Sequence, residues 1–354
     1  MGTRSDNGAA RSSLRPGQLV EVRSAAEIFA TLDKDGRIDG LPFMPEMLAF
    51  CGRTFRVSKR ADKTCDTVNH TTGLRRLLDT VHLEATRCDG SAHGGCQAEC
   101  LLFWKEVWLR PLDDAQPVDE ASSGGAKPST GTPGPRPERA HPMAPVLIQL
   151  TRRPTAESPD LDRYFCQATE LPAASSPLPW WDPTQYVRDV RSGNVGVLGL
   201  VAGLSRWTFV KFQAKILRRG AIPFVHGRLT RTPRNVLNLR PGDRVRVKSM
   251  EEIAQTLDRG NRNRGLSFDS EFLPYCGREF VVRRRVEGII DEPSGRMIEL
   301  HSDCLILDGV VCGARYHRFC PRQIHPYWRE IWLTRVDSPA DSPAPRERTA
   351  TTVG

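Results

Sequence analysis

Residues 88–109 read CDGSAHGGCQAECLLFWKEVWL, and residues 312–333 read CGARYHRFCPRQIHPYWREIWL. Both stretches carry a Cys-x4-His-x2-Cys motif, which is followed at the same spacing by a pair of tryptophans. A recurrence of this kind within one chain indicates a tandem repeat. We therefore expect one fold that is used twice, with a candidate metal site in each copy.

Shorter matches extend the repeat toward the N-terminal side of each motif. The tetrapeptide LRPG stands at 14–17 and again at 239–242, and the tripeptide CGR stands at 51–53 and 276–278, an offset of 225 residues in both cases. From Cys88 onward the offset is 224. Each copy spans roughly 100 residues, which is enough for a small core that a bound metal would help to hold together.

The pattern inside each copy is mostly that of β-strands. A Pro-Gly turn precedes the alternating pair Val20 and Val22, and the same occurs before Val245 and Val247. A Ser-x2-Glu capping box then predicts a short helix near residue 27 and another near residue 252. In the second copy a hairpin is expected to turn near residues 293–295. The fold class that follows is mainly β with some α: two tandem small SH3-like antiparallel barrels, each with a Cys/His zinc-binding loop, plus a helical insert.

Two resemblances agree with this architecture. The Pro-Gly-x2-Val-x-Val opening is similar to those of SH3-like and KOW-type barrels. The stretches 103–109, 316–322 and 327–333 resemble those of a bacterial group, without an established activity, that carries two SH3-like repeats with Cys/His metal sites. The resemblance covers both repeats, and it implies the architecture without implying an activity.

Composition divides the rest of the chain. The segment 113–142 is rich in Pro, Gly and Ser and buries too little apolar surface to offset its chain entropy. Within the following residues, 146–150 predict a short strand. The expected organisation is a disordered tail (1–13), repeat 1 (14–112), a mostly disordered linker (113–178), a basic helical insert (179–236), repeat 2 (237–337) and a second disordered tail (338–354).

The first residues are polar and lack the apolar core of a signal peptide, so we expect a cytoplasmic protein. Thiols stay reduced in that compartment, and the ten cysteines then favour metal binding over disulfides.

The ligand types point to zinc, and we expect two ions. Zinc takes four thiolate or imidazole ligands in structural sites. The second repeat offers a Cys3His set, with His325 as a spare: Cys304, Cys312, His317 and Cys320. The first repeat offers four thiols, with His93 in reserve: Cys65, Cys88, Cys96 and Cys100. Whether His93 and His317 are ligands stays open, and the alternative is that the cysteines are small apolar core residues.

Other features favour structural roles. Cys51 and Cys276 precede Gly-Arg in both copies and are expected to be core thiols, while Cys166 is uninformative. The Trp pairs alternate with aliphatic residues, which favours a buried strand over an aromatic binding platform. A closed four-ligand metal site has no open position for water. We therefore favour a non-enzymatic binding or adaptor protein, and a zinc- or thiol-dependent enzyme remains an alternative.

The central insert carries the charge of the protein. Residues 187–236 contain ten basic residues and one acid, and the whole chain has a formal net charge of +9. The expected partner-binding residues lie on a basic amphipathic helix: Arg206, Lys211, Lys215, Arg218 and Arg219. Such a helix fits a protein partner or an anionic membrane surface, with peripheral attachment. Nucleic acid is the alternative partner, and a purely internal packing role is a further one. No small-molecule substrate can be identified.

Overall fold

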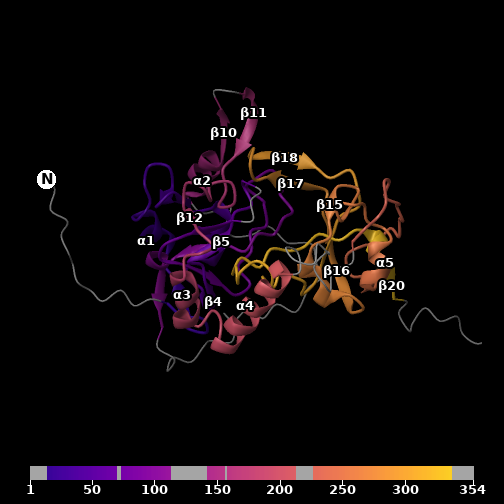
Figure 1. Ribbon diagram of the computed structural model, residues 1–354. Coiled ribbons are helices and arrows are strands. Elements are labelled where there is room, and N and C mark those ends of the chain that lie inside the picture. Colours follow the sequence, from indigo (N-terminus) through magenta and orange to yellow (C-terminus); the bar gives the residue numbers. More distant parts are fainter. Residues whose placement is uncertain (1–13, 70–72, 113–141, 156–157, 213–225, 337–354) are drawn as a thin grey trace, which may run out of the picture. The chain divides into compact units, whose positions relative to one another are not determined.

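A computed structural model describes residues 14–69, 73–112, 142–155, 158–212 and 226–336. It combines helices with several small antiparallel sheets (Figure 1). Among these residues, no sheet closes into a barrel, so the expected pair of SH3-like barrels is not confirmed. In the largest sheet the two edge strands, β8 (Trp104–Lys105) and β9 (Leu109–Pro111), do not pair with each other.

The chain divides into two compact units. The first unit contains residues 1–223, 286–301 and 311–326, and the second contains 224–285, 302–310 and 327–354.

The first unit is built on a five-stranded sheet of order β8-β7-β4-β1-β9. Its elements up to residue 111 are β1 (Leu19–Val22), α1 (Ala25–Phe29), β2 (Arg37–Ile38), β3 (Leu41–Pro42), η1 (Pro45–Phe50), β4 (Thr54–Arg60), β5 (Lys63–Cys65), β6 (Leu74–Arg76), β7 (Thr80–Leu83), β8, η2 (Glu106–Trp108) and β9, where η marks a 3-10 helix. The apolar faces of these elements form one buried core.

The second unit is built on a four-stranded sheet of order β19-β16-β13-β20. Its elements are β13 (Arg244–Val247), α5 (Met250–Ala254), β14 (Arg262–Asn263), β15 (Leu266–Ser267), η5 (Ser270–Tyr275), β16 (Glu279–Arg285), β19 (Leu305–Leu307), η6 (Glu330–Trp332) and β20 (Leu333–Arg335). It has a buried core of its own.

Equivalent positions of the two repeats form equivalent local structure. Both predicted capping boxes are present, at the start of α1 and of α5. All four tryptophans of the Trp pairs are fully buried, which confirms their core role. The second indole of each pair donates to a helix-end threonine: Trp108 to Thr31 at 3.1 Å and Trp332 to Thr256 at 3.0 Å.

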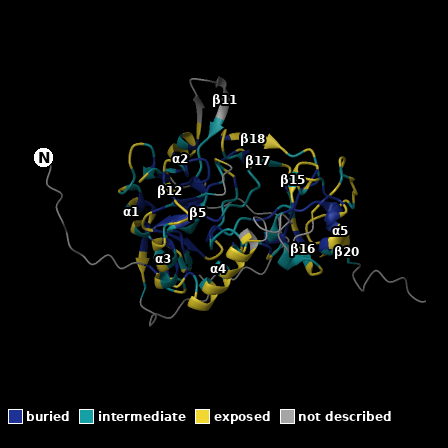
Figure 2. Cartoon of the chain, viewed as in Figure 1, coloured by how far each residue is buried: buried dark blue, intermediate teal, exposed yellow. Residues whose placement is uncertain are grey.

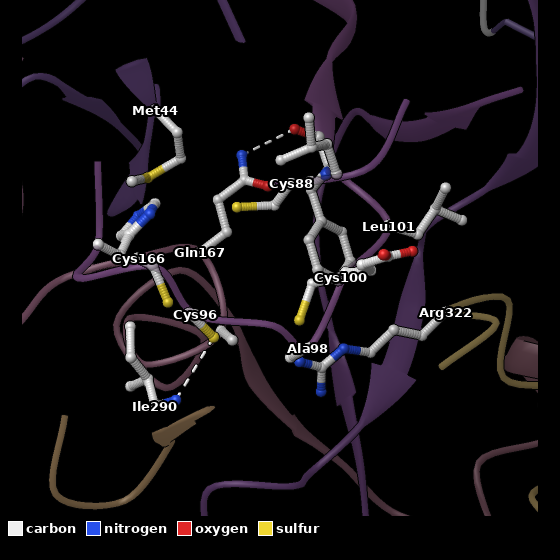
Figure 3. A pocket seen from close by; sticks show the side chains of 15 residues that line it. Met44, Cys88, Cys96, Ala98, Cys100, Leu101, Cys166, Gln167, Ile290 and Arg322 are labelled. Atoms are coloured by element: carbon white, nitrogen blue, oxygen red, sulfur yellow. Dashed lines mark hydrogen bonds between the residues drawn. The ribbon is translucent and has the colours of Figure 1, made fainter. Parts of the chain in front are cut away.

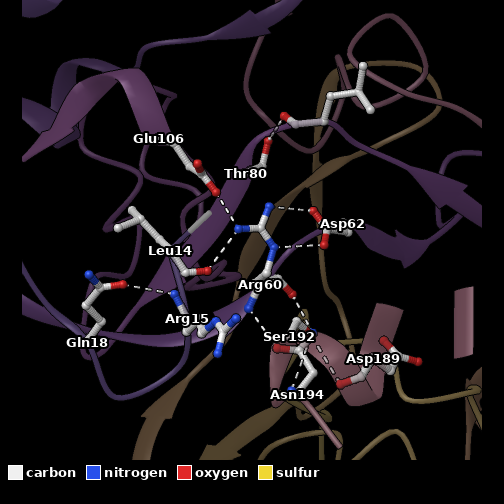
Figure 4. A network of polar contacts seen from close by, with 11 residues as sticks. Leu14, Arg15, Gln18, Arg60, Asp62, Thr80, Glu106, Asp189, Ser192 and Asn194 are labelled. Carbon is white, nitrogen blue, oxygen red and sulfur yellow. Dashed lines mark hydrogen bonds and ion pairs between the residues drawn. The ribbon is translucent and has the colours of Figure 1, made fainter. Parts of the chain in front are cut away.

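An arginine ties the start of each repeat to its Trp-pair segment. In the first unit the Arg60 guanidinium pairs with Asp62 at 2.8 Å and with Glu106, and it donates to the carbonyl of Leu14 at 2.9 Å (Figure 4). In the second unit Arg285 makes the corresponding contacts with Glu330 and with the carbonyl of Leu239. The repeat therefore extends to the polar contacts that close each core.

Residues 142–178 correct two sequence predictions. They form α2 (Ala144–Thr151), β10 (Arg152–Thr155), β11 (Ser158–Tyr164) and β12 (Ser176–Leu178), so the expectation of a mostly disordered linker is wrong for this part, while 113–141 lie outside the described residues. The strand expected at 146–150 is helical. Pro145 sits in the first turn, where proline is tolerated, and Ala144 and Leu147 are buried at helical spacing.

Two further helices follow, α3 (Thr184–Ser192) and α4 (Val197–Phe212). The ammonium of Lys63 on β5 forms a buried ion pair with Asp189 on α3, which fixes that helix to the β5–β6 hairpin. Among the described residues, no helix has both the length and the apolar character needed to cross a bilayer.

The predicted hairpin of the second repeat is present as β17 (Gly288–Asp291) and β18 (Arg296–Glu299), and it belongs to the first unit. It lies beside β11 in Figure 1, where the amide of Tyr164 donates to the carbonyl of Gly295 at 2.8 Å.

Candidate metal centre

The two Cys-x4-His-x2-Cys motifs fold into the same kind of loop, and both loops belong to the first unit. The second Cys of each motif donates its amide to the carbonyl of the motif His, at 3.3 Å in Cys96–His93 and 3.1 Å in Cys320–His317. Gly90 is required for the first loop, because its φ is +72° and a Cβ there would lie 2.0 Å from the carbonyl oxygen of Cys96. The loop geometry thus places the imidazole and the thiols of each motif in one region.

Glu46, Cys88 and His93 form the clearest candidate group. One ligand atom from each lies within 4.8 Å of the others. Glu46 comes from η1 and is 4% exposed, and His93 from the loop is 1% exposed. Their atoms Oε1 and Nδ1 are 2.6 Å apart, and Nε2 of His93 and Oε2 of Glu46 have no hydrogen-bond partner among the described residues. Buried polar atoms without partners are rare, and a bound cation would satisfy them.

The electrostatics of the group follow from its burial. Burial alone would raise the pKa of Glu46, but its contact with His93 and the hydrogen bond from the amide of Ala92 lower that pKa below its ordinary value. Burial, with the negative charge of Glu46 nearby, raises the pKa of the Cys88 thiol well above its ordinary value. The Glu46 carboxylate therefore lies beside the Cys88 thiol, and a nearby positive charge would be needed for this thiol to lose its proton.

Three more thiols line the same cavity: Cys96, Cys100 and Cys166 (Figure 3). Burial raises the pKa of Cys100 to about 11 and that of Cys166 to about 12. The Sγ atom of Cys96 accepts a hydrogen bond from the amide of Ile290 on β17 at 3.4 Å. The cavity thus gathers sulfur, nitrogen and oxygen donors, and the thiolate and imidazole donors fit a zinc ion.

A second candidate group contains Cys312 and His317, whose Sγ and Nδ1 atoms are 3.6 Å apart. Cys320 lies in the same loop, and its Sγ accepts a hydrogen bond from the amide of Cys65 at 3.1 Å. Burial alone would raise the pKa of Cys320. Hydrogen bonds from the Cys65 thiol and from the amides of Arg322 and Cys65 lower it instead.

The structure groups the predicted ligands differently from the sequence prediction. Cys88, His93, Cys96 and Cys100 are together as expected. Cys65 was assigned to that group, but it contacts Cys320 in the other loop. Cys304 was assigned to the second loop, yet it is a buried residue of the second unit, where burial raises its pKa to about 12.

Sequence reasoning missed Glu46 and left Cys166 uninterpreted. Glu46 had a usable signal, because a glutamate recurs 225 residues later as Glu271. Cys166 had none, because it lies outside both repeats and reaches the cavity only through the tertiary fold.

The predicted partner-binding residues are only partly described. Arg206 is exposed on α4, with its guanidinium 5.9 Å from the ring centre of Tyr316. Lys211 lies in α4, but the structure describes only its backbone. Lys215, Arg218 and Arg219 lie outside the described residues. Their role remains a prediction.

No protein-family model, no curated protein and no solved structure matches this chain.

Proposed function

We propose that the protein is a non-enzymatic, zinc-stabilised binding or adaptor protein. The observation that carries this proposal is the Glu46–Cys88–His93 group, in which the buried Nε2 of His93 and Oε2 of Glu46 lack hydrogen-bond partners among the described residues. Zinc would supply the missing partner for these atoms and, with thiolates from the same cavity, would cross-link η1 to the 88–100 loop. Structural zinc contributes its binding free energy directly to folding.

A structural role is favoured over catalysis by the state of the thiols. A nucleophilic cysteine needs a depressed pKa and access to solvent. In this cavity burial raises the pKa of Cys88, Cys96, Cys100 and Cys166, which makes them poor nucleophiles without a metal. A bound cation would lower these pKa values.

The experiment is metal analysis of the full chain after expression in zinc-replete medium. We expect zinc to co-purify, and His93→Ala and Glu46→Gln to remove one equivalent by deleting a ligand. His82→Asn is the matched control, because His82 is equally buried but does not belong to the group. Full zinc retention by His93→Ala, with an unchanged melting temperature, would contradict the proposal.

The exposed face of α4 favours one class of partner. Leu198, Val201, Phe209 and Phe212 recur at helical spacing and are more than half exposed, and Figure 2 shows much of the helix exposed. The sequence also has basic residues at the end of α4 and beyond it, at 211, 215, 218 and 219. Leu198 and Val201 are aliphatic side chains, which insert between lipid chains but do not stack on bases, so we favour an anionic lipid surface over nucleic acid as the partner of α4.

A further inference from the structure

The hairpin of each repeat donates a hydrogen bond to the Cys/His loop of the other repeat. Cys65 ends β5 in the first repeat, yet its amide donates to Sγ of Cys320 in the second loop at 3.1 Å. Ile290 lies on β17 in the second repeat, yet its amide donates to Sγ of Cys96 in the first loop at 3.4 Å. Cys65 and Ile290 are equivalent positions, as are Cys96 and Cys320. The two hydrogen bonds are therefore the same contact made in both directions.

A partly buried polar network fixes this exchange of hairpins. The hydroxyl of Thr67, just after β5, donates to the carboxylate of Glu292, just after β17, and these two residues are also equivalent in the repeat. The guanidinium of Arg322 contacts both of them, at 2.6 Å from Oγ1 of Thr67 and 2.9 Å from Oε1 of Glu292. Arg322 is only 2% exposed, so the crossing point is part of the folded interior.

The exchange balances the ligand count of the two loops. The first loop contains Cys100, whose equivalent in the second loop is Ile324. The second loop receives Cys65 from β5, whose equivalent on β17 is Ile290. A thiol that the second loop lacks in its own sequence is thus delivered by the hairpin of the other repeat.

The delivered thiol meets the ligands that the second loop already holds. Cys65, Cys312 and Cys320 pack in one small buried cluster. The Cys312 sulfur is 3.6 Å from Nδ1 of His317. Two thiols of this cluster and the imidazole come from one short loop, and the third thiol comes from a strand. Binding of one ion by all four donors would require their side chains to rotate toward a common point.

We propose that Cys65, Cys312, His317 and Cys320 bind a second zinc ion, in a Cys3His site whose fourth ligand is supplied by the other repeat. Three thiolates and one imidazole are a common tetrahedral set for structural zinc. The amide of Cys65 would stabilise the Cys320 thiolate as an outer hydrogen-bond donor. This site is separate from the Glu46–Cys88–His93 group, and it replaces Cys304 with Cys65 as a ligand.

The test compares zinc content across variants of the full chain, with circular dichroism as the check of folding. We expect the wild type to hold two equivalents and Cys65→Ser to hold one. Cys304→Ser is the matched control, because it removes a buried cysteine outside this set and should keep both. Cys65→His should restore the second equivalent, because imidazole replaces thiolate as a zinc ligand. If Cys65→Ser does not fold, the Cys65→His and Cys304→Ser variants still decide the question.

Each outcome separates this site from the first one. Two equivalents in folded Cys65→Ser, or one equivalent in Cys304→Ser, would overturn the proposal. A metal-free Cys65–Cys320 disulfide in peptide mapping of the freshly reduced and refolded protein would also overturn it. Zinc that is lost in Cys65→Ser but fully retained in His93→Ala would support this site and refute the first. Zinc that is lost in His93→Ala but fully retained in Cys65→Ser would support the first site and refute this one.

Discussion

At the scale of single residues, two buried histidines of the first unit show how surroundings decide a role. His82 and His93 are both essentially unexposed, and the Nε2 atom of each has no hydrogen-bond partner in the part of the chain that the structure describes. The Nδ1 atom of His82 faces the carbonyl of Leu102 at 2.8 Å, and its ring packs on Phe103. His93 instead faces the carboxylate of Glu46 and the sulfur of Cys88. His82 is thus a neutral core residue, whereas His93 is a proposed ligand.

The stability of the protein should depend on pH through His82. Burial lowers the pKa of His82 from 6.5 to about 4, despite its hydrogen bond to Leu102. Between these two values the unfolded state binds a proton that the folded state excludes, so the free energy of unfolding falls as the pH falls through this window. The loss should reach about 3 kcal/mol near pH 4. Urea unfolding at a series of pH values measures it.

The control for this prediction is His82→Asn, which keeps an N–H group for the Leu102 carbonyl but does not titrate. Its unfolding free energy should fall less steeply between pH 6.5 and 4 than that of the wild type. Parallel pH profiles of the two proteins would show that His82 is not the group responsible.

At the scale of elements, the sequence predicted the structural features that depend on residues close together in the chain. The capping boxes, the alternating strands, the β17–β18 hairpin and the burial of the Trp pairs are confirmed, because each follows from residues a few positions apart. The strand expected at 146–150 was wrong, because a short apolar run does not distinguish a strand from a buried helix. The ligand role of Cys65 was predicted, but its partner loop was not, because nothing local shows that β5 crosses to the other repeat.

The helix α4 is held by the loop that carries the second thiol cluster. Gly203 of α4 packs directly on the ring of Phe319, where a Cβ would lie 2.2 Å from the ring. Phe319 precedes Cys320, so order in the loop and the position of α4 are connected. The opposite face of α4 is left apolar and exposed.

Binding of α4 to lipid should require both its basic residues and its exposed apolar face. We expect the full chain to co-sediment with vesicles of mixed neutral and anionic phospholipid at low salt. Replacing Lys211, Lys215, Arg218 and Arg219 by Gln should weaken partitioning by several hundredfold, because each basic residue contributes about 1 kcal/mol near an anionic surface. Leu198→Ser with Val201→Ser should weaken it through lost apolar insertion.

Leu78→Ser is the matched control, because Leu78 is also more than half exposed but lies away from α4 in the sequence. It should leave vesicle binding unchanged. Binding of double-stranded or single-stranded DNA in place of vesicles would transfer the role of α4 to nucleic acid. Absence of binding to all three ligands at low salt would assign α4 to internal packing.

At the scale of the whole molecule, the repeat boundary and the boundary of the compact units differ. The sequence repeat places 286–301 and 311–326 in the second copy, whereas both segments belong to the first unit. Sequence comparison finds which residues are equivalent, but it does not show which copy a segment packs against, because equivalent segments have the same local preferences. The second unit keeps a separate core that includes Trp328 and Trp332. Both proposed zinc sites are therefore confined to the first unit.

This confinement predicts that removal of metal acts on one unit only. Chelation should accelerate amide hydrogen exchange at least about tenfold in residues 88–100 and 311–326, because these loops would lose the cross-links that hold them folded. Exchange in β13 and β16 should stay unchanged, because the core of the second unit contains none of the proposed ligands. Mass spectrometry of the exchanged full chain, with and without chelator, resolves these segments. The double variant His93→Ala, Cys65→Ser should reproduce the pattern without chelator. Equal acceleration in both units would show that metal supports the molecule as one cooperative whole, and that the two cores do not fold independently.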